Sequence, residues 1–186
     1  MRTCLITFLL IMPFLMLGVG INFSFANDEL TSEGGVDYLE FDVMANANET
    51  GTQLGTGIVL INYNQAAFGQ FVSNNDKLTV EKGILTQNEG APVYNIIKND
   101  NISNRFAITF EYTSSAGWGN ALILSPQQLV HVKIEILDTQ QTSDLSFEES
   151  LMQGQQYYDD NATKYDPDSC NPWVLYMFPY RVSILN

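Results

Sequence analysis

The sequence predicts an all-β fold, an antiparallel β-sandwich of the jelly-roll kind with one short helix near residues 146–154. Roughly seven segments of strand length follow one another at spacings of roughly ten residues, as in sandwiches. No helices alternate with them, which argues against a parallel α/β sheet. Hydrophobic residues make up 45% and charged residues 16% of the 186 residues, which indicates one folded domain with a substantial core.

The central strand is expected within residues 57–69, an apolar run that ends in a turn with two aromatic residues. The strand part is apolar at every position, on both faces of a pleat whose side chains alternate with a period of two: Ile58, Val59, Leu60 and Ile61. Such a run is typical of a strand that is covered on both sides. We therefore expect it to lie in the middle of a sheet.

Three further segments alternate between apolar and polar residues, and we expect strands at 36–45, 105–113 and 129–137. Their inward residues should form the core together with Val59 and Ile61: Leu39, Phe41, Val43, Phe106, Ile108, Phe110, Tyr112, Val130, Val132, Ile134 and Ile136. Their outward residues give polar outer faces: Glu40, Asp42, Thr109, Glu111, His131, Lys133 and Glu135.

Shorter elements complete the domain. Residues 78–85 predict a strand with a bulge at Gly83, and 94–97 predict another strand. Loops or turns are expected at 46–56, 66–71, 89–92, 99–104 and 114–120. Ser146 and Glu149 have the spacing of a capping box, so we expect a helix there, with Leu151 and Met152 on one face.

Domain boundaries follow from changes in composition. Residues 1–26 have the charged start, apolar centre and small-residue end of a signal peptide, with cleavage expected after Ala26; an uncleaved membrane anchor is the alternative. Residues 27–35 are expected to be a flexible leader, and residues 36–168 the sandwich. Residues 169–186 form an apolar tail without an acidic residue: a last strand, an exposed end, or the product of a truncated or frame-shifted gene.

Charge and cysteine content exclude several classes of function. The formal net charge of −13, with only 8 Lys and Arg, disfavours nucleic acids and anionic membrane surfaces, so membrane contact is expected only through the signal segment. Cys4 leaves with that segment, so Cys170 is left without a partner for an intrachain disulfide. One His and one Cys are too few for a typical zinc site.

Three stretches carry a resemblance to a known family. They are Tyr38–Val43, Gly57–Asn64 with Ala67–Gly69, and Arg105–Phe110. They resemble the cohesin-like domains of secreted Bacteroidetes proteins, over residues 36–168. The resemblance implies a sandwich shared with cohesins and carbohydrate-binding modules, a noncatalytic role, and a place in surface proteins that the type IX system exports.

Two binding sites are candidates. Trp118, between two glycines, is the aromatic side chain that we expect to be exposed for ligand binding. An acidic segment has five hard oxygen ligands of the kind that calcium binds, although without the EF-hand spacing: Asp159, Asp160, Asn161, Asp166 and Asp168. A solvated acidic loop is the alternative, and no other cofactor is expected.

Two function classes remain. The first is a noncatalytic extracellular binding or adhesion module, secreted or on the cell surface, with a protein or a polysaccharide as partner. The second is a secreted hydrolase that uses the paired carboxylates of the acidic segment, or a nucleophile pair of Cys170 with His131. Adjacent acids usually point apart into solvent, so we expect a binding module and not an enzyme.

Overall fold

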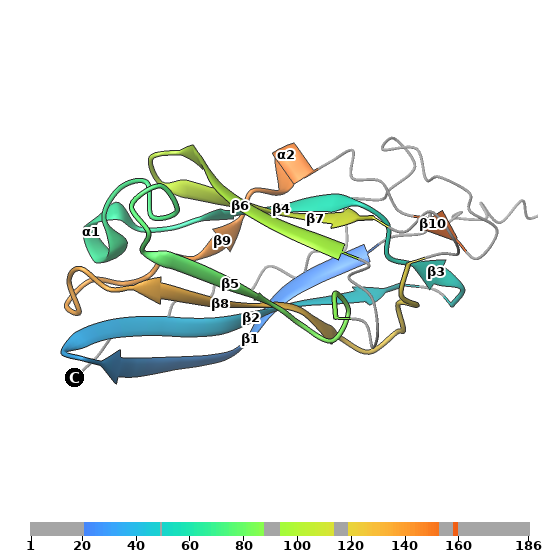
Figure 1. Ribbon diagram of the computed structural model, residues 1–186, viewed down its shortest axis with the longest axis horizontal. Helices are drawn as coiled ribbons and strands as arrows, with labels where there is room; N and C mark the ends of the chain where they lie inside the picture. Colours follow the sequence, from blue (N-terminus) through green and yellow to red (C-terminus); the bar gives the residue numbers. More distant parts are fainter. Residues whose placement is uncertain (1–20, 49, 88–93, 114–118, 153–157, 160–186) are drawn as a thin grey trace, which may run out of the picture.

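Two four-stranded antiparallel sheets face each other in the computed structural model, with the core between them (Figure 1). The structure describes residues 21–48, 50–87, 94–113, 119–152 and 158–159. The first sheet has the order β1-β2-β8-β5 and the second the order β6-β7-β4-β9. The predicted all-β sandwich is confirmed.

The first sheet is built from β1 (Ile21–Glu33), β2 (Val36–Ala47), β8 (Gln127–Glu135) and β5 (Leu78–Lys82). The second is built from β6 (Tyr94–Ile102), β7 (Arg105–Tyr112), β4 (Gly57–Asn62) and β9 (Ser146–Phe147). Strands β3 (Thr52–Gln53) and β10 (Tyr158–Asp159) pair in a small separate sheet.

Two short helices flank the sandwich (Figure 1). Helix α1 (Gln65–Phe68) follows β4, and its N-cap Asn64 accepts a hydrogen bond from the backbone N–H of Ala66 at 2.9 Å. Helix α2 (Glu149–Met152) follows β9. The capping-box prediction is wrong in detail, because Ser146 lies in β9 opposite Asn62 and not at the start of the helix.

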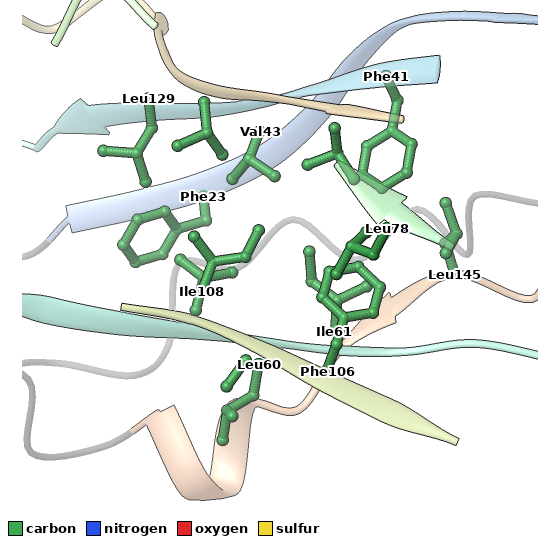
Figure 2. Packing of buried hydrophobic residues seen from close by; sticks show 14 of the residues in the cluster. Phe23, Phe41, Val43, Leu60, Ile61, Leu78, Phe106, Ile108, Leu129 and Leu145 are labelled. Atoms are coloured by element: carbon green, nitrogen blue, oxygen red, sulfur yellow. The ribbon is translucent and has the colours of Figure 1, made fainter. Parts of the chain in front are cut away.

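The core contains the side chains that alternation assigned to it, together with others such as Leu54, Phe68 and Tyr94. All eleven inward residues of the three alternating segments are buried except Tyr112, which is half-buried. Figure 2 shows Phe41, Val43 and Leu129 pointing from the first sheet toward Ile108 and Phe106 of the second. Between Val43 and Met44 the register of β2 shifts by one residue against β8, so Leu129 joins Val130 in the core.

The central strand is β4, as expected. It pairs with β7 on one side and β9 on the other. Val59 and Ile61 are fully buried toward the core, and Leu60, on the opposite face, is only 4% exposed. Figure 2 shows Leu60 pointing away from the core toward α2, which accounts for a strand that is apolar on both faces.

Several predicted boundaries need correction. Residues 27–35, expected to be a flexible leader, are the second half of β1 and its glycine turn, held by pairs such as Leu30 with Leu39. Strand β6 continues to Ile102 through the predicted turn at 99–104, because its polar residues lie on an edge strand in contact with solvent. The turn predicted at 89–92 lies outside the described residues.

Candidate functional site on the outer sheet faces

The outer face of the first sheet carries a hydrogen-bonded charge network centred on His131. Because β2 and β8 are antiparallel, their register sets Asp42 opposite His131 and Glu40 opposite Lys133. His131 Nδ1 lies 2.9 Å from Asp42 Oδ1, and His131 Nε2 lies 3.2 Å from Glu40 Oε2. Both ring nitrogens are therefore held by carboxylates.

The partners of His131 have partners of their own. Lys133 Nζ lies 3.1 Å from Glu40 Oε1 and 2.7 Å from Glu33 Oε1. Asp42 accepts hydrogen bonds at 2.7 Å from the side-chain amides of Asn27 and Gln128. The network sets three carboxylates against Lys133 and His131, and each of these charged groups already has a partner, so a ligand that docked here would have to break existing pairs.

Protonation of the network follows from these contacts. Burial by itself lowers the pKa of His131, but the hydrogen bonds to Asp42 and Glu40 outweigh it and raise that pKa above its ordinary value. The pKa of Glu40 is lowered, chiefly by the hydrogen bond from Thr31. The pKa of Asp42 is lowered too: burial raises it, and the hydrogen bonds from Asn27, His131 and Gln128 more than offset that.

The outer face of the second sheet has a different character. Ile97 of β6 lies directly opposite Thr109 of β7, and Thr109 lies opposite Ile58 of β4. These three residues are called the outer row below. Ile97 is 48% exposed, and the other two are half-buried. Two β-branched aliphatic side chains and a threonine thus form a strip across three strands.

Helix α2 extends this apolar strip. The next row of the sheet pairs Ala107 with Leu60, and both are buried although they face away from the core. The helix packs against β4, where Met152 is 8% exposed. Leu151 on the same helix is 53% exposed. The outer row therefore lies next to helix α2, which adds an exposed leucine to this face.

Polar groups border this face at the end where β6 turns into β7. Arg105 Nη1 lies 3.3 Å from Glu148 Oε2, and Asn62 Nδ2 donates to the same oxygen at 3.2 Å. The hydrogen bond from Ser150, together with that from Asn62 and the charge of Arg105, lowers the pKa of Glu148. An apolar strip bordered by fixed polar groups is typical of a protein-contact surface.

The predicted site residues are described only in part. Trp118, Asp160, Asn161, Asp166, Asp168 and Cys170 lie outside the described residues. Asp159 lies in β10, where its backbone pairs with Thr52. Within the described ranges no group of three or more His, Cys, Asp or Glu residues is placed to hold a metal ion. The calcium site and the role of Trp118 stay predictions.

The glycine that follows Trp118 has a packing role that the sequence did not suggest. A Cβ atom on Gly119 would lie 1.7 Å from the backbone oxygen of Leu54 and 2.3 Å from the hydroxyl of Tyr94. That hydroxyl donates to Leu54 O and accepts from the N–H of Asn120. Close backbone approach therefore requires glycine at position 119.

These observations define an antiparallel β-sandwich with two unlike outer faces. The second type II cohesin module of the cellulosomal adaptor ScaA scaffoldin of Acetivibrio cellulolyticus is similar to it, with a TM-score of 0.50 and 15% identity over 82% of this chain and 91% of that chain. A cohesin module from a family 33 glycoside hydrolase of Clostridium perfringens has a TM-score of 0.49 and 13% identity, over 81% and 90% of the two chains.

Type II cohesin A11 from Bacteroides cellulosolvens has a TM-score of 0.49 and 13% identity, over 81% and 93% of the two chains. No protein-family model matches the chain, and a search of curated proteins finds no match. The likeness to solved structures shows the fold alone, and it confirms the predicted cohesin-like fold. No helix among the described residues is long and apolar enough to cross a membrane.

Proposed function

We propose that this chain is a noncatalytic, extracellular module that binds a protein partner on the outer face of β6-β7-β4. The observation that carries the proposal is the contrast between the two outer faces. The first sheet presents paired charges around His131, and the second presents the outer row and the exposed Leu151. Burying aliphatic side chains contributes free energy to association, whereas separating charge pairs costs it.

A protein partner fits this face better than a polysaccharide does. Sugar rings stack on exposed aromatic side chains, and the outer row consists of two isoleucines and a threonine. Among the large hydrophobic side chains that the structure describes, the exposed aromatic one is Phe71, in the turn after α1 and not on this face. The net charge of −13 would also speed association with a positively charged partner.

Export and the surface setting are part of the same proposal. The signal-like start and the resemblance to cohesin-like domains of secreted Bacteroidetes proteins support secretion, with type IX export as the finer expectation. The structural neighbour from Acetivibrio cellulolyticus is itself a module of an adaptor scaffoldin. A binding role without catalysis agrees with a His131 that has both ring nitrogens held by carboxylates.

A retention assay tests the proposal. The protein is immobilised and exposed in turn to extracellular proteins of the source culture and to insoluble polysaccharides, and the bound fraction of each is measured. Ile97→Glu and Ile58→Glu place a charge in the outer row, and Thr79→Glu, an exposed site of β5, is the matched control. We expect the wild type and the control to retain a protein whose affinity falls at least about tenfold in both row variants. Retention of polysaccharide alone, or equal retention by all variants, would contradict the proposal.

Calcium binding by the acidic segment is a separate proposal. Asp159 pairs through β10 with β3, so the segment that begins there is anchored at one end. If calcium binds residues 159–168 of the folded chain, millimolar calcium should raise the unfolding temperature, because a ligand of the native state stabilises it. An unfolding temperature that is the same in calcium and in a chelator would exclude the site.

A further inference from the structure

Strand β1 has two halves of different character, joined by an irregularity at Asn27. Its first half, residues 21–26, pairs with β2 from Ile21 opposite Ala47 to Ala26 opposite Asp42. The register shifts between Ala26 and Glu29, and Asn27 has a positive φ of 53°. The second half pairs Glu29–Glu33 with Glu40–Val36 and is mostly exposed.

The first half carries the apolar contacts. Phe23 is 5% exposed and belongs to the core cluster, and Phe25 packs against that cluster. The Phe25 ring stacks on the Phe147 ring of β9, with centroids 4.1 Å apart and planes 10° apart. The same ring meets Phe41 edge to face at 5.4 Å. Cleavage after Ala26 would remove all of these contacts and leave the exposed half.

We infer that the precursor is processed between Gly20 and Ile21, so that the mature chain begins at the first residue of β1. Signal peptidases require small residues one and three positions before the cut, and both Gly18 with Gly20 and Ser24 with Ala26 satisfy this. The sequence alone does not decide between the two bonds. The structure does, because only the cut after Gly20 preserves β1.

The assigned site also suits the leader. Residues 5–17, which follow the positive Arg2, are apolar apart from Thr7 and Pro13, and Gly18 comes directly after them. The reaction is hydrolysis: water adds across the Gly20–Ile21 amide, which leaves a carboxylate on Gly20 and an α-ammonium group on Ile21. The peptidase meets the chain before it folds, so later burial of β1 does not hinder the cut. This inference rests on the proposed export.

The test expresses the full-length chain in a bacterial host and reads the N-terminus of the exported product by sequencing and intact mass. Two matched variants place arginine before each candidate bond. Gly20→Arg blocks the assigned site, and Ala26→Arg blocks the other; residue 26 is half-buried and lies opposite Asp42, so the introduced cation has a carboxylate on the neighbouring strand. We expect wild type and Ala26→Arg to begin at Ile21, and Gly20→Arg to accumulate as precursor.

Three results would overturn the inference. A wild-type product that begins at Asn27 would exclude the assigned bond while export stands. Loss of processing in Ala26→Arg would show that the peptidase reads the later site. A product that still begins at Met1 would overturn both this assignment and the proposed export.

Discussion

At the scale of the residue, His131 makes stability depend on pH. Its pKa is raised in the folded state, so its contribution is fully present below its unfolded pKa of about 6.5 and is lost as pH rises through the higher folded value. Glu40 and Asp42 have lowered pKa values, so their contribution is present above about pH 4 and is lost as pH falls through the folded values. We expect maximal stability between about pH 4.5 and 6.5.

Denaturant titrations of wild type and His131→Asn at pH 5.5 and pH 8 check this expectation. The wild type should be more stable at pH 5.5, and the variant should lose a large part of that difference. Some pH dependence will remain in the variant, because acidification also reduces the net negative charge of the chain. A variant that keeps the full difference would show that His131 contributes nothing to it.

Phe106 and Thr109 test the phase of β7. Phe106 is fully buried, and its ring lies 6.0 Å from that of Tyr63, whereas Thr109 faces outward in the same strand. Phe106→Ala should lower the free energy of unfolding by about 3–5 kcal/mol, because it removes apolar contacts and leaves a cavity. Thr109→Ala should cost less than about 1 kcal/mol. Equal losses in denaturant titrations would contradict the inward assignment of Phe106.

At the scale of the element, an aromatic seam joins the edge strands of the two sheets. β1 ends one sheet and β9 ends the other, and Phe25 stacks on Phe147 between them. A double-mutant cycle of Phe25→Ala and Phe147→Ala should give a coupling of about 0.5–1.5 kcal/mol. The control cycle combines Phe25→Ala with Ile84→Ala. Ile84 follows β5, which lies three strand spacings, or about 14 Å, from β1 across the sheet, so the two substitutions should be nearly additive. Equal coupling in both cycles would contradict a direct stack.

Alternation predicted the elements that have one buried face. β2, β7 and β8 have large apolar residues at alternate positions along most of their length, so their phase could be assigned before the fold was known. β6 and the second half of β1 are edge segments with polar residues on both faces, and no periodicity separates such strands from loops. Ser146 satisfied a capping pattern, but Phe147 packs on Phe25 and Phe23 and draws the segment into a strand.

The candidate binding face was harder to predict than the core. Thr109 and His131 were both assigned outward positions, but only the sheet order shows that they lie on opposite faces of the sandwich. The sequence predicts a short strand that includes Ile97, but the structure is needed to place its exposed side chain opposite Thr109 on the outer face. The sequence signal for this face was the apolar character of Ile58 and Leu60. A central strand that is apolar on both faces needs one layer over its inner face and another over its outer face.

At the scale of the whole molecule, the dominant electrostatic feature is the net charge of −13. Like charges spread over one domain repel each other and oppose the compact state. Raising the salt from about 0.01 M to about 0.15 M shortens the screening length from about 30 Å to about 8 Å, which removes long-range repulsion before it affects contact pairs such as Lys133 with Glu33 at 2.7 Å.

We therefore expect the thermal midpoint at pH 7 to rise when sodium chloride is added over this range. Salt also has an opposing effect, because it weakens local ion pairs. Lys77→Gln tests this effect, since Lys77 lies 3.1 Å from Glu135 in a partly exposed pair. Removing one positive charge increases the net negative charge, so the variant should gain more from salt than the wild type does. A midpoint that falls with salt would mean that local ion pairs, and not net repulsion, govern the electrostatic part of stability.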